Sequence, residues 1–156
     1  MNIINIGFTG INASRQNAPR GNISVSNNVK IDSVEETKMG IGESRQAYKV
    51  LFSFKTQYMP NFASIELKGE VLILDSAEEV SKAMDLWNKS KKLDVNAARA
   101  IVNAVMNRCS LEVILLSREI GLPSPIPLPS LKVQGAEGKA AVPAKEEKTA
   151  SKQKKK

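Results

Sequence analysis

The spacing of apolar residues changes once along this chain, at Asp75. Before Asp75, apolar side chains recur at every second residue, as they do in β-strands that turn one face to a core. After Asp75 they recur every three to four residues, as in helices that bury one stripe. The order of these periods predicts an α+β fold, a four-stranded antiparallel meander followed by two helices that cover one face.

Four segments before Asp75 carry the strand pattern. In the first, Gly10 breaks the phase of the apolar residues, which predicts a bulge and a bent strand. In the second, Asn27 interrupts the apolar face and Val34 marks another change of phase. The third and fourth are joined by a short turn at Met59-Pro60-Asn61 and form a hairpin. Their predicted apolar faces comprise Tyr48, Val50, Phe52, Phe54, Thr56, Tyr58, Ala63, Ile65, Leu67, Val71 and Ile73.

Two helices are predicted after the sheet. Ser76 and Glu79 have the spacing of a capping box for the first, and the lysines of residues 89–92 end it. Asp94 is the expected N-cap of the second helix. The second helix carries a buried stripe along its whole length: Ala98, Ile101, Val102, Val105, Cys109, Val113, Leu116 and Ile120.

The second helix ends at one glycine and runs into four prolines. Gly121 can adopt the left-handed conformation that closes a helix, Leu122 can fold back onto the last turn, and Pro123 prevents continuation. The alternating prolines predict an extended arm that carries Ile126 and Leu128 as apolar pegs. Two interpretations stay open: the arm packs against its own domain, or it is a docking peptide for a partner.

The net charge of +7 is concentrated at the C-terminal end. Residues 132–156 hold eight lysines against three glutamates, so +5 of the +7 lies there. We therefore predict one domain over residues 1–133 and a disordered basic tail over residues 134–156. The tail is either a solubilising segment or a contact for phosphates of RNA or the ribosome, through Lys152, Lys154, Lys155 and Lys156.

The sequence lacks the residue types and motifs that several kinds of catalytic and metal-binding site require. The chain has no histidine and a single cysteine, Cys109, so we expect no internal disulfide, no Cys/His metal site and no base for a cysteine nucleophile. Phosphate-binding glycine loops and GxSxG turns are absent from the sequence. No apolar run approaches the roughly 20 residues of a membrane span. We expect a cytosolic protein that is not an enzyme and has no cofactor or catalytic residue.

Two surfaces are predicted from the apolar pattern. The paired third and fourth strands give a broad apolar face, part of which is expected to stay open to extended polypeptides. The residues expected to bind them are Phe52, Phe54, Tyr58, Ile126 and Leu128. Leu111, Ile114 and Leu115 widen the apolar stripe of the second helix, which indicates burial against a second subunit or under the arm.

The chain resembles the SecB family of export chaperones in more than the order of its elements. Asn17-Ala18-Pro19, followed by Val29-Lys30-Ile31-Asp32, is similar to the asparagine-alanine-proline and lysine-leucine-aspartate pattern of that family. The helix leading into a proline- and leucine-containing arm is similar too, and the resemblance covers residues 1 to about 133. The ending at residues 121–129 resembles most closely small archaeal proteins with a GLPxPIPLP motif.

The resemblance implies an ATP-independent chaperone that holds unfolded chains in apolar grooves. It also implies a dimer or tetramer built through the first strand and the long helix, with an interface of Ile4, Ile6, Phe8, Leu111, Ile114 and Leu115. SecB proteins are typically acidic, often with a metal-binding tail for the translocation motor, whereas this tail is lysine-rich. The chain therefore departs from the family in the segment that serves export delivery. The alternative hypothesis is a ribosome- or RNA-associated accessory protein anchored by the tail.

Overall fold

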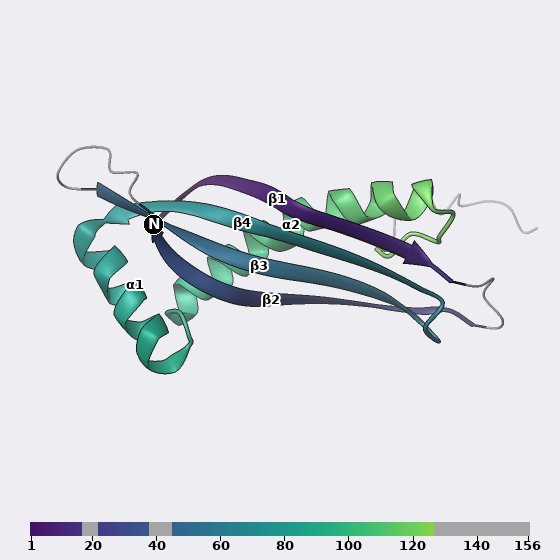
Figure 1. Ribbon diagram of the computed structural model, residues 1–156, viewed down its shortest axis with the longest axis horizontal. Helices are drawn as coiled ribbons and strands as arrows, with labels where there is room; N and C mark the ends of the chain where they lie inside the picture. Colours follow the sequence, from purple (N-terminus) through teal and green to yellow (C-terminus); the bar gives the residue numbers. More distant parts are fainter. Residues whose placement is uncertain (17–21, 38–44, 127–156) are drawn as a thin grey trace, which may run out of the picture.

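The computed structural model describes residues 1–16, 22–37 and 45–126. Its sheet has four antiparallel strands, β1 (Asn2–Arg15), β2 (Ser24–Thr37), β3 (Arg45–Met59) and β4 (Ala63–Ser76), followed by helices α1 (Ala77–Ser90) and α2 (Val95–Glu119) (Figure 1). The predicted fold class is confirmed. The predicted meander order is wrong in one respect, because β1 pairs with β4. The observed strand order is β1-β4-β3-β2, and β1 and β2 are the two edge strands.

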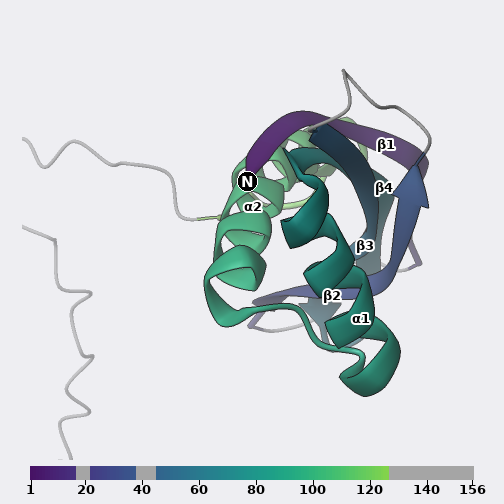
Figure 2. The ribbon, with the colours of Figure 1, turned by 90° about the vertical axis from the view of Figure 1, so that its left-hand side faces the viewer.

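Both helices lie on one side of the curved sheet (Figure 2). Each begins at the predicted cap: the Ser76 hydroxyl accepts from the Glu79 amide at 3.4 Å, and the Asp94 carboxylate accepts from the Asn96 amide at 2.9 Å. Lys91, in a left-handed conformation, ends α1. Local side-chain to backbone bonds therefore fix where both helices start, before any packing on the sheet.

Bulges in both edge strands explain the phase changes seen in the sequence. The register of β1 against β4 shifts between Phe8 and Gly10, as predicted, and also between Ile3 and Asn5. The register of β2 against β3 shifts between Ile31 and Ser33, so Ile31 and Val34 pair with Phe52 and Val50 on the same face. The extra residues bend the edges while keeping the apolar side chains turned inward.

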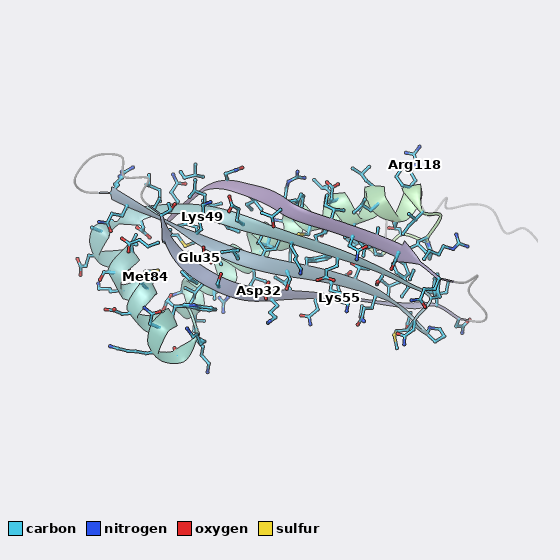
Figure 3. All side chains as sticks on the ribbon, viewed as in Figure 1. Asp32, Glu35, Lys49, Lys55, Met84 and Arg118 are labelled. Atoms are coloured by element: carbon cyan, nitrogen blue, oxygen red, sulfur yellow. The ribbon has the colours of Figure 1, made fainter. Side chains whose placement is uncertain are left out.

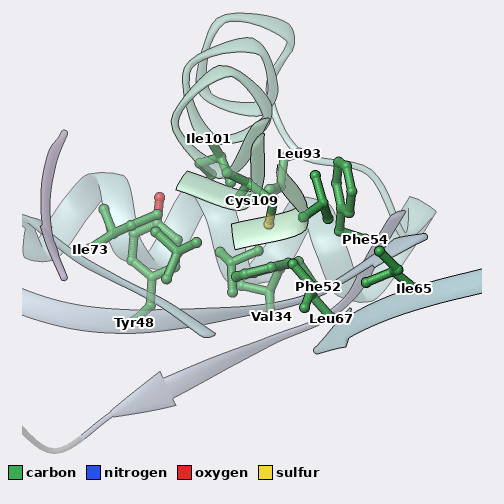
Figure 4. Packing of buried hydrophobic residues seen from close by; sticks show 14 of the residues in the cluster. Val34, Tyr48, Phe52, Phe54, Ile65, Leu67, Ile73, Leu93, Ile101 and Cys109 are labelled. Atoms are coloured by element: carbon green, nitrogen blue, oxygen red, sulfur yellow. The ribbon is translucent and has the colours of Figure 1, made fainter. Parts of the chain in front are cut away.

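The core lies between the inner face of the sheet and α2 (Figure 4). The predicted apolar faces of β3 and β4 are buried, as is the stripe of Ile101, Val105, Cys109 and Val113 on α2. Gly69 allows this packing: a methyl group there would lie 2.6 Å from the Phe52 ring and would also meet the Gly7 carbonyl oxygen. The Phe52 ring lies edge-on to Phe8 in the neighbouring strand.

The opposite face of the sheet carries mainly polar side chains. Lys49 and Glu70, on paired strands, form an ion pair at 2.9 Å, and Lys68 lies 3.7 Å from Glu66. Lys49, Glu35 and Lys55 project from this face in Figure 3. One face of the sheet is therefore solvated, and the candidate site has to be sought on the helical side or at an edge.

The long helix α2 is the one described helix with the length and composition of a membrane span, at a mean hydropathy of 1.4 over 18 residues. Core helices of water-soluble proteins have the same composition, and the stripe of α2 packs on the sheet. This observation is therefore weak evidence for a membrane. It does draw attention to the large apolar side chains that α2 leaves exposed: Val95 at its start, and Leu111 and Leu115 in its second half.

Candidate functional site

The chain leaves α2 at the predicted stop and turns back over the inner face of the sheet. Gly121 has a φ of 65°, in the left-handed region, and the Leu122 amide donates to the Ser117 carbonyl at 2.7 Å. We call residues 122–126 the strap. It contains neither helix nor strand, and it begins close to the end of β1, where α2 ends in Figure 1.

Side chains from three strands hold the main chain of this region at alternate residues. Arg15 of β1 donates to the Gly121 carbonyl at 3.0 Å, and the Tyr58 hydroxyl of β3 donates to the Pro123 carbonyl at 2.9 Å. Asn27 of β2 donates to the Pro125 carbonyl at 3.3 Å. Because these donors follow the strand order from one edge to the other, the strap crosses the sheet from the β1 side to the β2 side.

A polar pair inside the apolar face supports the last of these bonds. The Thr56 hydroxyl, fully buried, donates to the Asn27 amide oxygen at 2.7 Å, which turns the amide nitrogen toward Pro125. In the sequence, Asn27 only interrupts a row of apolar residues and Thr56 continues the row of β3. Sequence reasoning missed both as functional residues, although a paired asparagine and threonine on facing strands is the signal that could have found them.

The apolar side chains of the strap complete the contact. Leu122 and Pro125 are buried, and Ile126 is half-buried against the core cluster. The Ser124 hydroxyl donates to the Ile126 carbonyl at 2.6 Å within the strap. Since proline has no amide hydrogen, Pro123 and Pro125 can lie on the sheet without leaving a donor unsatisfied. The contact therefore combines apolar burial with hydrogen bonds accepted by main-chain carbonyls.

The predicted client-binding side chains lie mostly inside this contact. Phe52, Phe54 and Tyr58 are at most 1% exposed, so the apolar face expected to stay open is covered by α2 and the strap. Tyr58 reaches the strap through its hydroxyl, and Ile126 belongs to the strap itself. Leu128 lies outside the described residues. For the part of the arm that is described, the interpretation that it packs on its own domain is the one the contacts favour.

The predicted interface residues divide into two groups. Ile4, Leu111 and Leu115 are 52, 63 and 56% exposed, which is unusual for large apolar side chains. Ile6, Phe8 and Ile114 are half-buried; the Arg108 guanidinium lies 4.9 Å from the centre of the Phe8 ring. The interface itself stays a prediction.

A second recess, of about 650 Å³, lies between α1, the start of α2 and the ends of β3 and β4. Tyr48, Leu86 and Leu93 contribute apolar surface, and Asp75 and Glu79 stand at its edge. Burial above all, and then the charges of Asp75 and Glu79, raise the pKa of the Tyr48 phenol to about 12. At neutral pH this phenol is therefore protonated, and it can donate a hydrogen bond but cannot act as a base.

The single cysteine of the chain lies on α2, in the core. Cys109 is fully buried, and burial raises the pKa of its thiol to about 12, so it is protonated and inaccessible in this conformation. Among the residues that the structure describes, no cluster of three or more acidic or cysteine side chains could hold a metal ion. Lys152, Lys154, Lys155 and Lys156 lie outside these residues.

The comparisons with known proteins identify the fold. No family model matches the chain, and no curated protein matches it. Among solved structures, the chain is similar to the SecB-like chaperone Rv1957 of Mycobacterium tuberculosis, solved with a ChAD peptide from the HigA1 antitoxin Rv1956. The two share 17% identity with a TM-score of 0.56, over 84% of this chain and 89% of that one.

The chain therefore has a SecB-like fold, as the resemblance implied. The sequence identity is too low to carry the neighbour's peptide or its partners over to this chain. The similarity to archaeal proteins with a GLPxPIPLP ending stays a prediction.

Proposed function

We propose that this protein is an ATP-independent chaperone-like module of the cytosol that binds unfolded or nascent polypeptides and is not an enzyme. A SecB-like fold whose solved neighbour is a chaperone bound to a peptide supports this class of function. The chain's own binding geometry gives the proposal its content, because the fold alone does not determine what is bound.

The observation that carries the proposal is the way in which the strap is held. Tyr58 and Asn27 bind it through main-chain carbonyls, which every residue type provides, and the apolar face beneath accepts Leu122 and Pro125. Recognition of this kind depends on backbone shape and apolarity more than on a particular side chain. Beside the strap, β2 is an edge strand, so a bound segment could also pair with its backbone.

Self-association is the second part of the proposal. Leu111 and Leu115 project from α2, and Ile4 is exposed on the opposite edge strand, β1. Two copies meeting through α2 and β1 would cover these side chains in a dimer or tetramer. The β2 edge and the strap would stay free for polypeptides in such an assembly.

The decisive experiment is suppression of aggregation. We expect the full-length protein, without nucleotide, to suppress aggregation of a chemically unfolded client at stoichiometric ratio, at both about 50 and about 200 mM salt, because apolar binding depends little on salt. As a matched control, the protein lacking residues 134–156 should suppress equally well, since every residue assigned to the proposed groove precedes residue 127.

The opposite result would favour the basic tail as the functional element. In that result the protein does not suppress aggregation of the client but binds RNA tightly. The RNA binding weakens steeply over the same salt range and disappears when residues 134–156 are removed. A protein with that behaviour would be the ribosome- or RNA-associated one. Export delivery would need a separate test, with the translocation motor as the binding partner.

A further inference from the structure

We infer that the strap occupies this protein's own polypeptide-binding groove, and that clients displace it; the inference rests on the proposed function. The occupant that fits the vacated groove is an apolar segment containing proline, with main-chain carbonyls available at alternate residues. The strap is thus an intramolecular competitor that sets the affinity for clients.

The first argument is that the groove is complementary to a main chain, with donors of this protein pointing at acceptors of the bound segment. Tyr58 and Asn27 come from neighbouring strands, and their acceptors, the Pro123 and Pro125 carbonyls, are two residues apart. Thr56 holds the Asn27 amide in place from inside the core. The Asn27 donor therefore stays oriented when the strap leaves, and it can bind a carbonyl of another segment.

The second argument is that an empty groove would be costly. The Tyr58 ring is fully buried in the closed form, and burial raises the pKa of its hydroxyl. Without the strap, the Tyr58 hydroxyl would lose its acceptor, and the apolar surface under Leu122 and Pro125 would be exposed to water. The groove is therefore more stable when a segment fills it, and client binding is an exchange in which the client replaces the strap.

The third argument is that the strap is held less firmly than the rest of the core. It is five residues long, lacks helix and strand, and exposes Pro123 and Ser124. Short segments with few buried contacts open at a small fraction of the global unfolding free energy. The strap can therefore leave while α2 and the sheet remain folded.

The proline content of the strap indicates the class of client. A segment lying across the strands cannot donate its amides to the sheet in the way a paired strand does, so each buried amide hydrogen would be left unsatisfied. Proline at two of five positions removes that cost. We expect the groove to prefer segments with proline between apolar residues over equally apolar segments without it.

The experiment locks the strap with a disulfide in the full-length protein. Asn27→Cys and Pro125→Cys introduce the pair at two residues joined by a hydrogen bond of 3.3 Å, and non-reducing gel electrophoresis checks that the disulfide has formed. Both redox forms lack the Asn27 donor, so the difference between them measures the lock alone. Cys109 is buried and does not compete for oxidation. The probe is fluorescently labelled, reduced and carboxymethylated lactalbumin, which stays unfolded, and the reduced form of the same variant is the matched control.

We expect oxidation to weaken client binding by at least about tenfold and reduction to restore it. Leu122→Ser, which loosens the strap without changing the groove, should strengthen client binding about threefold to tenfold. Met59→Ser, which removes an exposed apolar side chain from the last residue of β3, should leave it unchanged. A peptide of residues 121–126 should compete with the client, and its variant with alanine in place of both prolines should compete less.

The experiment distinguishes failure of the strap inference from failure of the proposed function. If the oxidised and reduced forms bind the client equally and tightly, the strap is not a competitor, while the proposed function stands. If the wild-type protein, Leu122→Ser and the reduced variant all fail to bind, the proposed function is wrong and the strap is a structural closure of the core.

Discussion

The Tyr58 hydroxyl donates a hydrogen bond at 2.9 Å to the carbonyl of Pro123, 65 residues further along the chain. This bond joins the middle of the sheet to the segment that follows the last helix. A buried phenol needs a partner for its polar end, and a proline carbonyl in an irregular segment needs a donor. Each group satisfies the other, which is why the strap lies where it does.

Tyr58→Phe should lower the free energy of unfolding by about 1 kcal/mol, because the Pro123 carbonyl loses its donor while the apolar ring stays in place. Urea denaturation measures this loss. Tyr48→Phe is the matched control: no hydrogen bond of the Tyr48 hydroxyl is found among the described residues, and we expect a change below about 0.5 kcal/mol. Equal losses in the two variants would contradict a specific role for the Tyr58 bond.

The phenol of Tyr48 should titrate at about pH 12 in the folded protein, compared with 10.0 for the free side chain. The chain has two tyrosines, so Tyr58→Phe leaves Tyr48 as the only phenol, and near-ultraviolet absorbance can follow it. A midpoint close to 10 in the folded state would contradict the burial of this hydroxyl. Asp75→Asn should lower the midpoint slightly, since burial is the largest cause of the shift.

The same shift has a consequence for stability. Because folding raises the pKa, the folded state holds the proton more tightly, and the stabilisation is complete below pH 10 and lost as the pH rises toward 12. We expect a loss of about 1 to 3 kcal/mol over this range. The loss should be smaller by this amount in Tyr48→Phe, in which the raised pKa of Tyr58 still contributes, as measured by urea denaturation at both ends of the range.

Gly69→Ala should destabilise the protein by about 1 to 3 kcal/mol or more. The new methyl group would lie 2.6 Å from the Phe52 ring and would also meet the backbone of Gly7, which cannot move without disturbing β1. Gly10→Ala is the control, since its methyl group would have the Lys68 side chain as its nearest neighbour at 3.8 Å. Similar melting temperatures for both variants would contradict the packing described for Phe8 and Phe52.

The strand and helix pattern could be predicted because local rules decide it. Alternation fixed the inner faces of β3 and β4, and short-range caps at Ser76 and Asp94 fixed where the helices begin. The pairing of β1 with β4 could not be predicted in the same way, because strand order depends on contacts between distant segments. A bulged, apolar first strand is compatible with either neighbour until the whole sheet is assembled.

The candidate site was predicted only in part for a related reason. The helix stop at Gly121 and the proline arm are local signals, and both could be recognised. Where the arm lies depends on the hydrogen bond between buried Thr56 and exposed Asn27, which come from separate strands. Periodicity treats Asn27 as an interruption and Thr56 as one more inward side chain, so it predicts a binding role for the aromatic residues and none for this pair. Of those aromatic residues, Phe52 and Phe54 are buried in the core, and Tyr58 reaches the strap through its hydroxyl.

Self-association through α2 gives the last prediction. Leu115 is 56% exposed in the single chain, so Leu115→Glu should leave the melting temperature of a monomer nearly unchanged. In an assembly that buries Leu115, the unpaired carboxylate would cost several kcal/mol and shift the sedimentation coefficient toward that of a monomer. Val95→Glu, at a 69% exposed position near the other end of the same helix, is the matched control and should keep the wild-type assembly. A wild-type protein that sediments as a monomer at micromolar concentration would refute the interface, and an oligomer that survives Leu115→Glu would place the interface elsewhere.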